Sequence, residues 1–156
     1  MSEADRPSAS IPEIEELLCF SVYSASHAFN KIYKPLLDEL GLTYPQFLVM
    51  VALWAKDDQT VGALGEKLFL ESSTLTPLLK RLEANGYLAR KRDLADERQV
   101  RISLTEAGAN LRARAAEVPQ CIKTATGLTE EALRHLTGEI AALRKSLQVS
   151  AKKAAG

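Results

Sequence analysis

Cys19 and the tyrosines that follow it are the residues best suited to chemistry in this sequence. The chain has four tyrosines, and three of them (Tyr23, Tyr33 and Tyr44) fall in the twenty-five residues after Cys19. A phenol that donates a hydrogen bond to a thiolate favours ionisation without adding a counter-charge, which makes the thiol more reactive. The alternative is that Cys19 is an inert, small apolar residue of the core. The residues alone leave both interpretations open.

The second cysteine, Cys121, follows Pro119 near a predicted helix break. It is either a thiol that resolves an oxidised Cys19 or a cysteine without a role. Cytosolic thiols are kept reduced, so a disulfide between the two would act as a signal rather than as a structural link. His27 and His135 lie far apart and lack companions at ligand spacing. We therefore expect no metal site and no cofactor.

Helices must position these residues. Apolar residues recur at three-to-four spacing over 14–40, which predicts a long helix that Pro35 interrupts or kinks. Thr43 and Gln46 then have the spacing of a capping box for a second helix over 44–56. A short helix over 60–68 follows, and Ser72, Ser73 or Thr74 is expected to cap the next helix, which ends at Asn85-Gly86.

The spacing of apolar residues then changes from the three-to-four repeat of a helix to the alternation of a strand. Residues 87–92 and 100–104 alternate like two strands around a polar turn at 93–97. A hairpin after two short helices is the winged helix-turn-helix arrangement. Thr105 caps a helix that reaches about residue 117, and a last helix runs from Thr129 to near Ser150, with frayed residues after it.

We therefore expect a mainly α fold with a small β-hairpin wing, dimerised through its N- and C-terminal helices. It would be one domain over 1–156, with dimerisation helices at 12–42 and 105–150 and a winged helix-turn-helix, DNA-binding region at 43–104.

Short polar and basic side chains mark the second short helix as a candidate DNA-reading helix. They are Ser72, Ser73, Thr74, Thr76, Lys80 and Arg81. At the predicted wing, Arg98 can enter a minor groove, and Asp96 can hold its guanidinium. The alternatives are an N-cap cluster on a solvated helix and an ordinary surface ion pair.

Charge and hydropathy set limits on partners and location. The chain has 20 basic and 20 acidic residues, so only a local patch can attract nucleic acid. Residues 80–101 supply one, with seven bases against four acids. The first eighteen residues hold five acids and one base, unlike a signal peptide, and the longest apolar run is nine residues. We expect a cytoplasmic protein without a membrane span.

Several motifs together resemble a known family. The run 75–83 (LTPLLKRLE), the wing 96–100 (DERQV) and 104–108 (LTEAG) resemble the MarR family of winged-helix regulators. More narrowly, 18–20 (LCF), 33–37 (YKPLL), 42–46 (LTYPQ) and 68–77 are similar to its OhrR subgroup of organic-hydroperoxide sensors.

The resemblance implies roles for individual residues. Cys19 matches the peroxide-reactive thiol, Tyr33 and Tyr44 match phenols that donate to it, and Tyr23 matches another pocket residue. The recognition helix matches 72–82, and Arg98 matches the wing arginine. Some members carry a second cysteine that forms an intersubunit disulfide, in the region of Cys121 or about one turn later. If Cys121 cannot reach, a small thiol would cap the Cys19 sulfenic acid.

The implied function is a homodimeric repressor that leaves double-stranded operator DNA when organic hydroperoxide oxidises Cys19. One alternative is a MarR-type repressor released by a non-covalent small phenolic ligand, with Cys19 as a core residue. A thiol peroxidase is the other, but the chain lacks a thioredoxin-like strand-helix alternation and a T-x-x-C segment. We therefore expect a protein that is not an enzyme.

Overall fold

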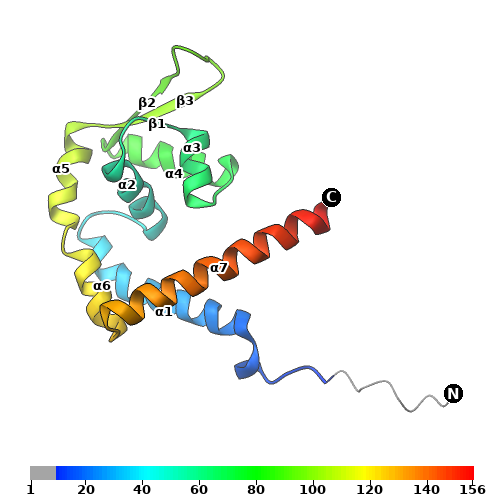
Figure 1. Ribbon diagram of the computed structural model, residues 1–156. Coiled ribbons are helices and arrows are strands. Elements are labelled where there is room, and N and C mark those ends of the chain that lie inside the picture. Colours follow the sequence, from blue (N-terminus) through cyan, green and yellow to red (C-terminus); the bar gives the residue numbers. More distant parts are fainter. Residues whose placement is uncertain (1–9) are drawn as a thin grey trace. The chain divides into compact units, whose positions relative to one another are not determined.

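The computed structural model describes residues 10–156 and is mainly helical, with one small sheet (Figure 1). Its elements in chain order are η1 (Ile14–Glu16), α1 (Leu18–Asp38), α2 (Tyr44–Ala55), β1 (Gln59–Thr60), α3 (Val61–Leu68), α4 (Ser72–Ala84), β2 (Leu88–Arg92), β3 (Val100–Leu104), α5 (Glu106–Ala115), α6 (Val118–Thr126) and α7 (Glu130–Ala155). The expected mainly α fold with a small β-hairpin is confirmed. Residues 1–9, which hold part of the acidic N-terminal segment, lie outside the described residues. Within 10–156, no helix is both long and apolar enough to cross a membrane.

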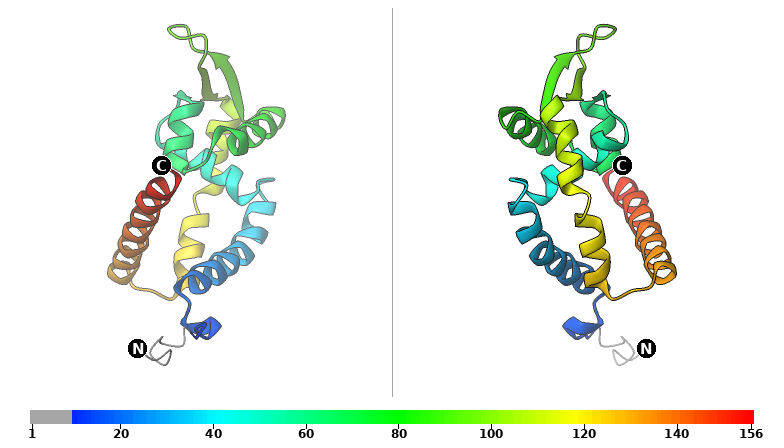
Figure 2. Two further views of the ribbon diagram at one scale, coloured as in Figure 1. Left: turned by 90° about the vertical axis from the view of Figure 1, so that its right-hand side faces the viewer. Right: turned by 90° about the vertical axis from the view of Figure 1, so that its left-hand side faces the viewer.

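The chain forms two compact units, one ending at Ala116 and the other running from Glu117 to Gly156. In the first unit, β1, β3 and β2 form an antiparallel sheet in that order. The β2–β3 hairpin projects beyond α3 and α4 with its loop at the tip, as a wing does (Figures 1 and 2). The strand β1 was not predicted, because two residues are too few to show an alternating pattern.

The core of the first unit lies where α2, α4 and the hairpin meet. Its most deeply buried side chains are Val49, Met50, Leu53, Leu64, Leu75, Leu79, Leu82, Leu88 and Ile102. The start of α5 closes against this core, where the Trp54 indole N–H donates to the Gly108 carbonyl at 2.9 Å. A Cβ on Gly108 would overlap the Tyr87 carbonyl oxygen, so only glycine allows this approach.

Several predicted helix ends are confirmed. Thr43 and Gln46 form the capping box of α2, Gly86 has a φ of 82° after α4, and Thr105 caps α5. Thr129 likewise caps α7, because its hydroxyl accepts from the Ala132 N–H at 3.1 Å. Local hydrogen bonding at polar residues sets these ends, which is why they could be predicted from sequence.

Other predicted helix ends are wrong. Residues 14–16 form a separate short 3₁₀ turn, and α1 continues through Pro35 to Asp38, since only one turn follows the proline. The N-cap of α4 is Glu71, and no side chain caps that helix, so Ser72 already lies inside it. α7 continues past Ser150 to Ala155, with lysines in its last turn that suit a helix C-terminus.

Candidate thiol site and nucleic-acid interface

Cys19 lies in the first turn of α1 and is exposed in the single chain, so it is not part of that chain's core. Tyr23 follows one helical turn later, on the same side of the helix. Its ring lies 4.3 Å from the ring of His27, another turn along. Cys19, Tyr23 and His27 therefore form one accessible stripe along α1.

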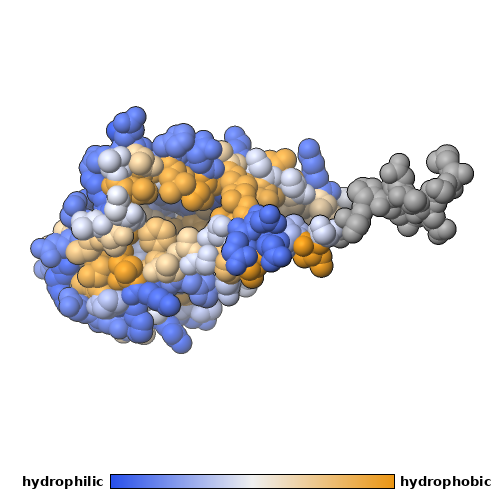
Figure 3. All heavy atoms as spheres, turned by 90° about the horizontal axis from the view of Figure 1, so that it is seen from below, coloured by the Kyte–Doolittle hydropathy of each residue, from blue (hydrophilic) through white to orange (hydrophobic). Residues whose placement is uncertain are grey.

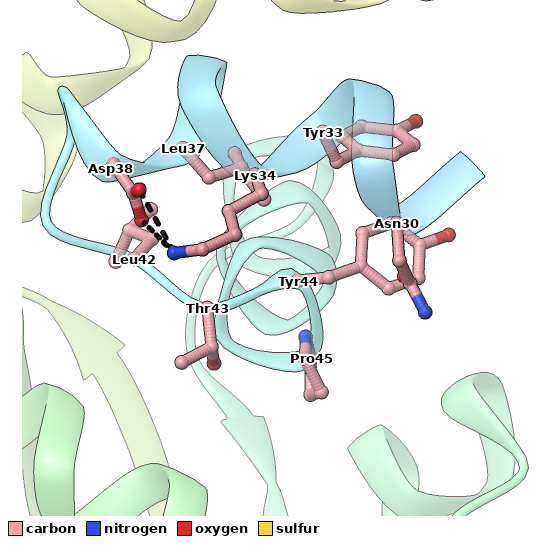
Figure 4. Close-up of a pocket in the computed structure, with 9 residues that line it drawn as sticks. All are labelled: Asn30, Tyr33, Lys34, Leu37, Asp38, Leu42, Thr43, Tyr44 and Pro45. Carbon is pink, nitrogen blue, oxygen red and sulfur yellow. Dashed lines mark hydrogen bonds and ion pairs between the residues drawn. The ribbon is translucent and has the colours of Figure 1, made fainter. Parts of the chain in front are cut away.

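Tyr33 and Tyr44 come together at the other end of α1. Their ring centroids are 4.6 Å apart, and Phe47 lies 5.9 Å from Tyr33. They line a pocket of about 320 Å³ between the end of α1 and the start of α2 (Figure 4). Lys34 and Asp38 form an ion pair at 3.0 Å in the same pocket.

Burial reinforces the protonated state of these two phenols. It raises the pKa of Tyr33 and of Tyr44 above the ordinary value of 10.0, and the neighbouring Tyr44 raises the pKa of Tyr33 further. Both hydroxyls therefore keep their protons at neutral pH. They are hydrogen-bond donors for an anion such as a thiolate.

Within one chain, Cys19 cannot meet these phenols. Cys19 and Tyr33 are fourteen residues apart in a single helix that runs from Leu18 to Asp38. At 1.5 Å per residue this is about 21 Å along the axis, more than a cysteine and a tyrosine side chain can span together. One chain thus supplies a thiol at one end of α1 and a pair of phenols at the other end.

The second cysteine belongs to the second unit. Cys121 lies on α6 and is exposed, and its backbone N–H donates to Glu117 at 3.1 Å. A nearby ion pair between Lys123 and Glu130 joins α6 to the start of α7. Cys121 is thus accessible for reaction in the single chain.

The predicted DNA-reading residues lie on α4 and in the wing. Ser72, Ser73 and Thr74 are exposed in the first turn of α4, and Lys80 and Arg81 are exposed further along it. Ser72, Thr76 and Arg98 line one groove of about 380 Å³ between α3, α4 and the wing. Residues separated by more than twenty positions in sequence therefore share one surface.

Arg98 is held at the tip of the wing. Its Nε donates to Asp96 Oδ1 at 3.1 Å, and its backbone N–H donates to the same oxygen at 3.1 Å. The side chain of Arg98 is 91% exposed. The ion pair expected from the sequence is present, and it leaves the guanidinium pointing into solvent with a restricted orientation.

Sequence reasoning missed an ionic cluster at the base of the wing. Arg101 on β3 contacts Asp58, in the loop after α2, and Asp93, in the wing. In the sequence, Arg101 was only one of several bases in a mixed-charge segment. The pairing with Asp58 depends on the short β1–β3 contact, which no pattern in the sequence indicates.

Comparison with known proteins places this arrangement in a family. Residues 31–114 match the family model described as transcriptional regulator SarA/Rot. The transcriptional regulator TtmR of Methylorubrum extorquens is 45% identical over 88% of this chain and 71% of its own length. The organic hydroperoxide resistance transcriptional regulator of Bacillus subtilis is 44% identical over 86% of this chain and 92% of its own length.

This chain is a winged-helix transcriptional regulator of the MarR family. Solved structures with the same fold agree. Reduced AbfR bound to DNA superposes on the regulator with a TM-score of 0.72 and 37% identity, over 83% of this chain and 90% of that one. A disulfide-formed AbfR gives a TM-score of 0.59 at 36% identity, over 86% and 90% of the two chains.

Proposed function

We propose that this regulator is a homodimeric repressor that binds operator DNA when reduced and leaves it when an organic hydroperoxide oxidises Cys19. The observation that carries the proposal is the placement of a thiol at one end of α1 and two protonated phenols at the other end. Its 44% identical relative in Bacillus subtilis, an organic hydroperoxide resistance regulator, supports the choice of oxidant. As a repressor it would act in the cytoplasm and would not be an enzyme.

A second copy of the chain would complete the thiol site. The helix α1 exposes a row of large apolar side chains, and α7 exposes another. They are Leu18, Val22, Phe29 and Ile32 on α1, and Leu136, Ile140 and Leu147 on α7. Apolar side chains also gather on the face drawn in Figure 3. Exposed apolar surface of this extent favours association, and an antiparallel meeting of two α1 helices would bring Cys19 of each chain to the phenols of the other.

The redox step follows ordinary thiol chemistry. The Cys19 thiolate attacks the terminal oxygen of the hydroperoxide, so that an S–O bond forms and the O–O bond breaks. The leaving alkoxide takes a proton and becomes an alcohol, and the sulfur becomes a sulfenic acid. A second thiol then attacks that sulfur, which forms a disulfide and releases water. We assign this second thiol to Cys121 of the partner, and to a small thiol if that cysteine cannot reach.

On DNA, the first turn of α4 would read base edges in the major groove. Lys80 and Arg81 would contact phosphates, and Arg98 would enter the adjacent minor groove. A disulfide that shifts the dimerisation helices would change the spacing between the two reading surfaces. The operator would then no longer fit both halves of the dimer.

A second function has an observation in its favour. The pocket between α1 and α2 lies within the roughly 300–1,000 Å³ range of small-molecule sites and is lined by two aromatic rings. A phenolic ligand bound there could release DNA without oxidation. Fluorescence anisotropy on labelled operator separates the two: we expect release by cumene hydroperoxide, with reversal by dithiothreitol, and retention in salicylate. Release by salicylate alone would favour the ligand-binding function.

A further inference from the structure

Arg101 links the wing to the rest of the first unit through the carboxylates of Asp58 and Asp93. Its Nε donates to Asp58 Oδ1 at 2.8 Å, and one terminal nitrogen donates to the Asp58 carbonyl at 2.7 Å. The other terminal nitrogen donates to Asp93 Oδ2 at 3.0 Å. Three contacts from one guanidinium use the planar fork that only arginine provides.

Asp93 carries this connection into the wing loop. Its Oδ1 accepts from the Ala95 N–H at 2.7 Å and from the Asp96 N–H at 3.3 Å. These backbone bonds, followed by the Arg101 contact, hold the pKa of Asp93 below its usual range, so the carboxylate stays charged at neutral pH. The side chain of Asp93 is only 14% exposed, unlike most of the loop.

Asp96 is the next member of the chain of contacts. Its backbone N–H is fixed by Asp93, and its carboxylate holds both the backbone and the guanidinium of Arg98. A continuous path of hydrogen bonds therefore runs from Asp58 through Arg101, Asp93 and Asp96 to the exposed Arg98. We call these first four residues the wing clamp.

Asp58 is suited to anchor the clamp. It has a φ of 53°, in the left-handed region that Asp and Asn tolerate better than most residues. The preceding Asp57 accepts from the Leu104 N–H at 2.8 Å, at the end of β3. The loop is thus tied to the sheet at two points, and the carboxylate at 58 has a fixed position.

We propose that Arg101, held by Asp58 and Asp93, is a positioning residue that orients the wing-tip Arg98 for DNA. The inference rests on the proposed DNA-binding function. Arg101 need not contact DNA itself, because it acts on Arg98 through Asp93 and Asp96. A wing without the clamp keeps its sheet but loses the fixed orientation of its tip.

The test uses Asp58→Asn, which keeps the side-chain shape and suits the positive φ. Removing an acid should by charge alone strengthen DNA binding, whereas loss of the clamp should weaken it. Glu66→Gln is the matched control, because Glu66 is exposed on α3 and its side chain forms no hydrogen bond or ion pair within residues 10–156. The probe is a duplex that wild-type protein enriches from a random-sequence pool.

The measured quantity is the factor by which Arg98→Ala weakens DNA binding in each background. A single groove arginine contributes roughly 1–3 kcal/mol, so we expect a loss of about fivefold or more in wild type and in Glu66→Gln. In Asp58→Asn the same substitution should cost less than about threefold, because Arg98 is already misplaced. Arg101→Leu should behave like Asp58→Asn, and Arg101→Lys should be intermediate. Equal costs in all backgrounds would overturn the proposal.

Hydrogen exchange of the DNA-free protein makes the test independent of DNA binding. The amides of Ala95, Asp96 and Arg98 should exchange roughly tenfold faster in Asp58→Asn, since the contact upstream of them between Arg101 and residue 58 loses its carboxylate charge and weakens. Amides of α2 should not change. Unchanged wing exchange would refute the clamp, whereas failure of wild type to bind any duplex would instead refute the proposed function.

Discussion

The separation of Cys19 from Tyr33 along α1 makes the thiol site a property of two chains, and subunit mixing can test this. Consider a heterodimer in which one chain carries Cys19→Ser and the other carries Tyr33→Phe with Tyr44→Phe. If the site forms between chains, the one remaining Cys19 faces two intact phenols. If it forms within a chain, the same cysteine has no phenol.

The expected difference in rate can be estimated from one hydrogen bond. A donor to a charged group contributes about 1.5–3 kcal/mol, and one pKa unit corresponds to about 1.36 kcal/mol. Each phenol should thus favour the Cys19 thiolate over the thiol by a factor of about ten to one hundred. Because a more basic thiolate is also a better nucleophile, with a Brønsted slope near 0.4–0.5, the net loss of rate should be about three- to tenfold per phenol. Loss of both should cost at least about tenfold.

The assay needs two differently tagged chains, both in a Cys121→Ser background, so that only Cys19 reacts. After tandem purification, the sulfenic acid formed with cumene hydroperoxide is trapped with dimedone and quantified by mass spectrometry. We expect the heterodimer to react at the wild-type rate per thiol, and the Tyr33→Phe, Tyr44→Phe homodimer to react slowly. A heterodimer as slow as that homodimer would refute assembly of the site between chains.

Three further predictions concern the reading head, the core and pH. Arg98→Ala should weaken operator binding about tenfold and reduce the slope of log affinity against log salt by about one, measured by fluorescence anisotropy from about 50 to about 200 mM salt. An unchanged slope would show that Arg98 is a surface charge that does not contact DNA. Gly108→Ala should lower the free energy of unfolding in urea by about 1–3 kcal/mol or more, because its Cβ overlaps the Tyr87 carbonyl, whereas Gly138→Ala, with open space around it, should raise it slightly. The two half-buried phenols, Tyr33 and Tyr44, have folded-state pKa values above the unfolded value of about 10. Their contribution to stability is therefore complete below that pH and is lost as pH rises through the folded-state values, and tyrosinate absorbance should show a late phase that the double phenylalanine variant lacks.

The parts of the fold that could be predicted are those determined by local chemistry. The capping box at Thr43 and Gln46, the cap at Thr105 and the left-handed Gly86 each depend on a few neighbouring residues. The alternation of β3 likewise reflects one buried face around Ile102. Such signals are complete within a short window of sequence.

Contacts between distant segments could not be predicted. The predicted cap of α4 is wrong. Serine and threonine at 72–74 are suited both to cap a helix and to lie exposed in its first turn, and here they lie in the first turn. The pairing of Arg101 with Asp58 spans 43 positions and depends on a two-residue strand. The site residues could be predicted from their types and from the resemblance to a family. The distance between Cys19 and Tyr33 could not, because it depends on α1 being one uninterrupted helix.

The most direct test of the account is operator release by Cys19→Ser protein. Wild type and Cys19→Ser are bound to the same labelled duplex and treated with cumene hydroperoxide, and the bound fraction is followed by anisotropy. The two proteins should bind with equal affinity before treatment, after which wild type should leave the duplex and Cys19→Ser should stay fully bound. Release of the Cys19→Ser variant at the same hydroperoxide concentration would contradict the assignment of Cys19 as the sensing thiol.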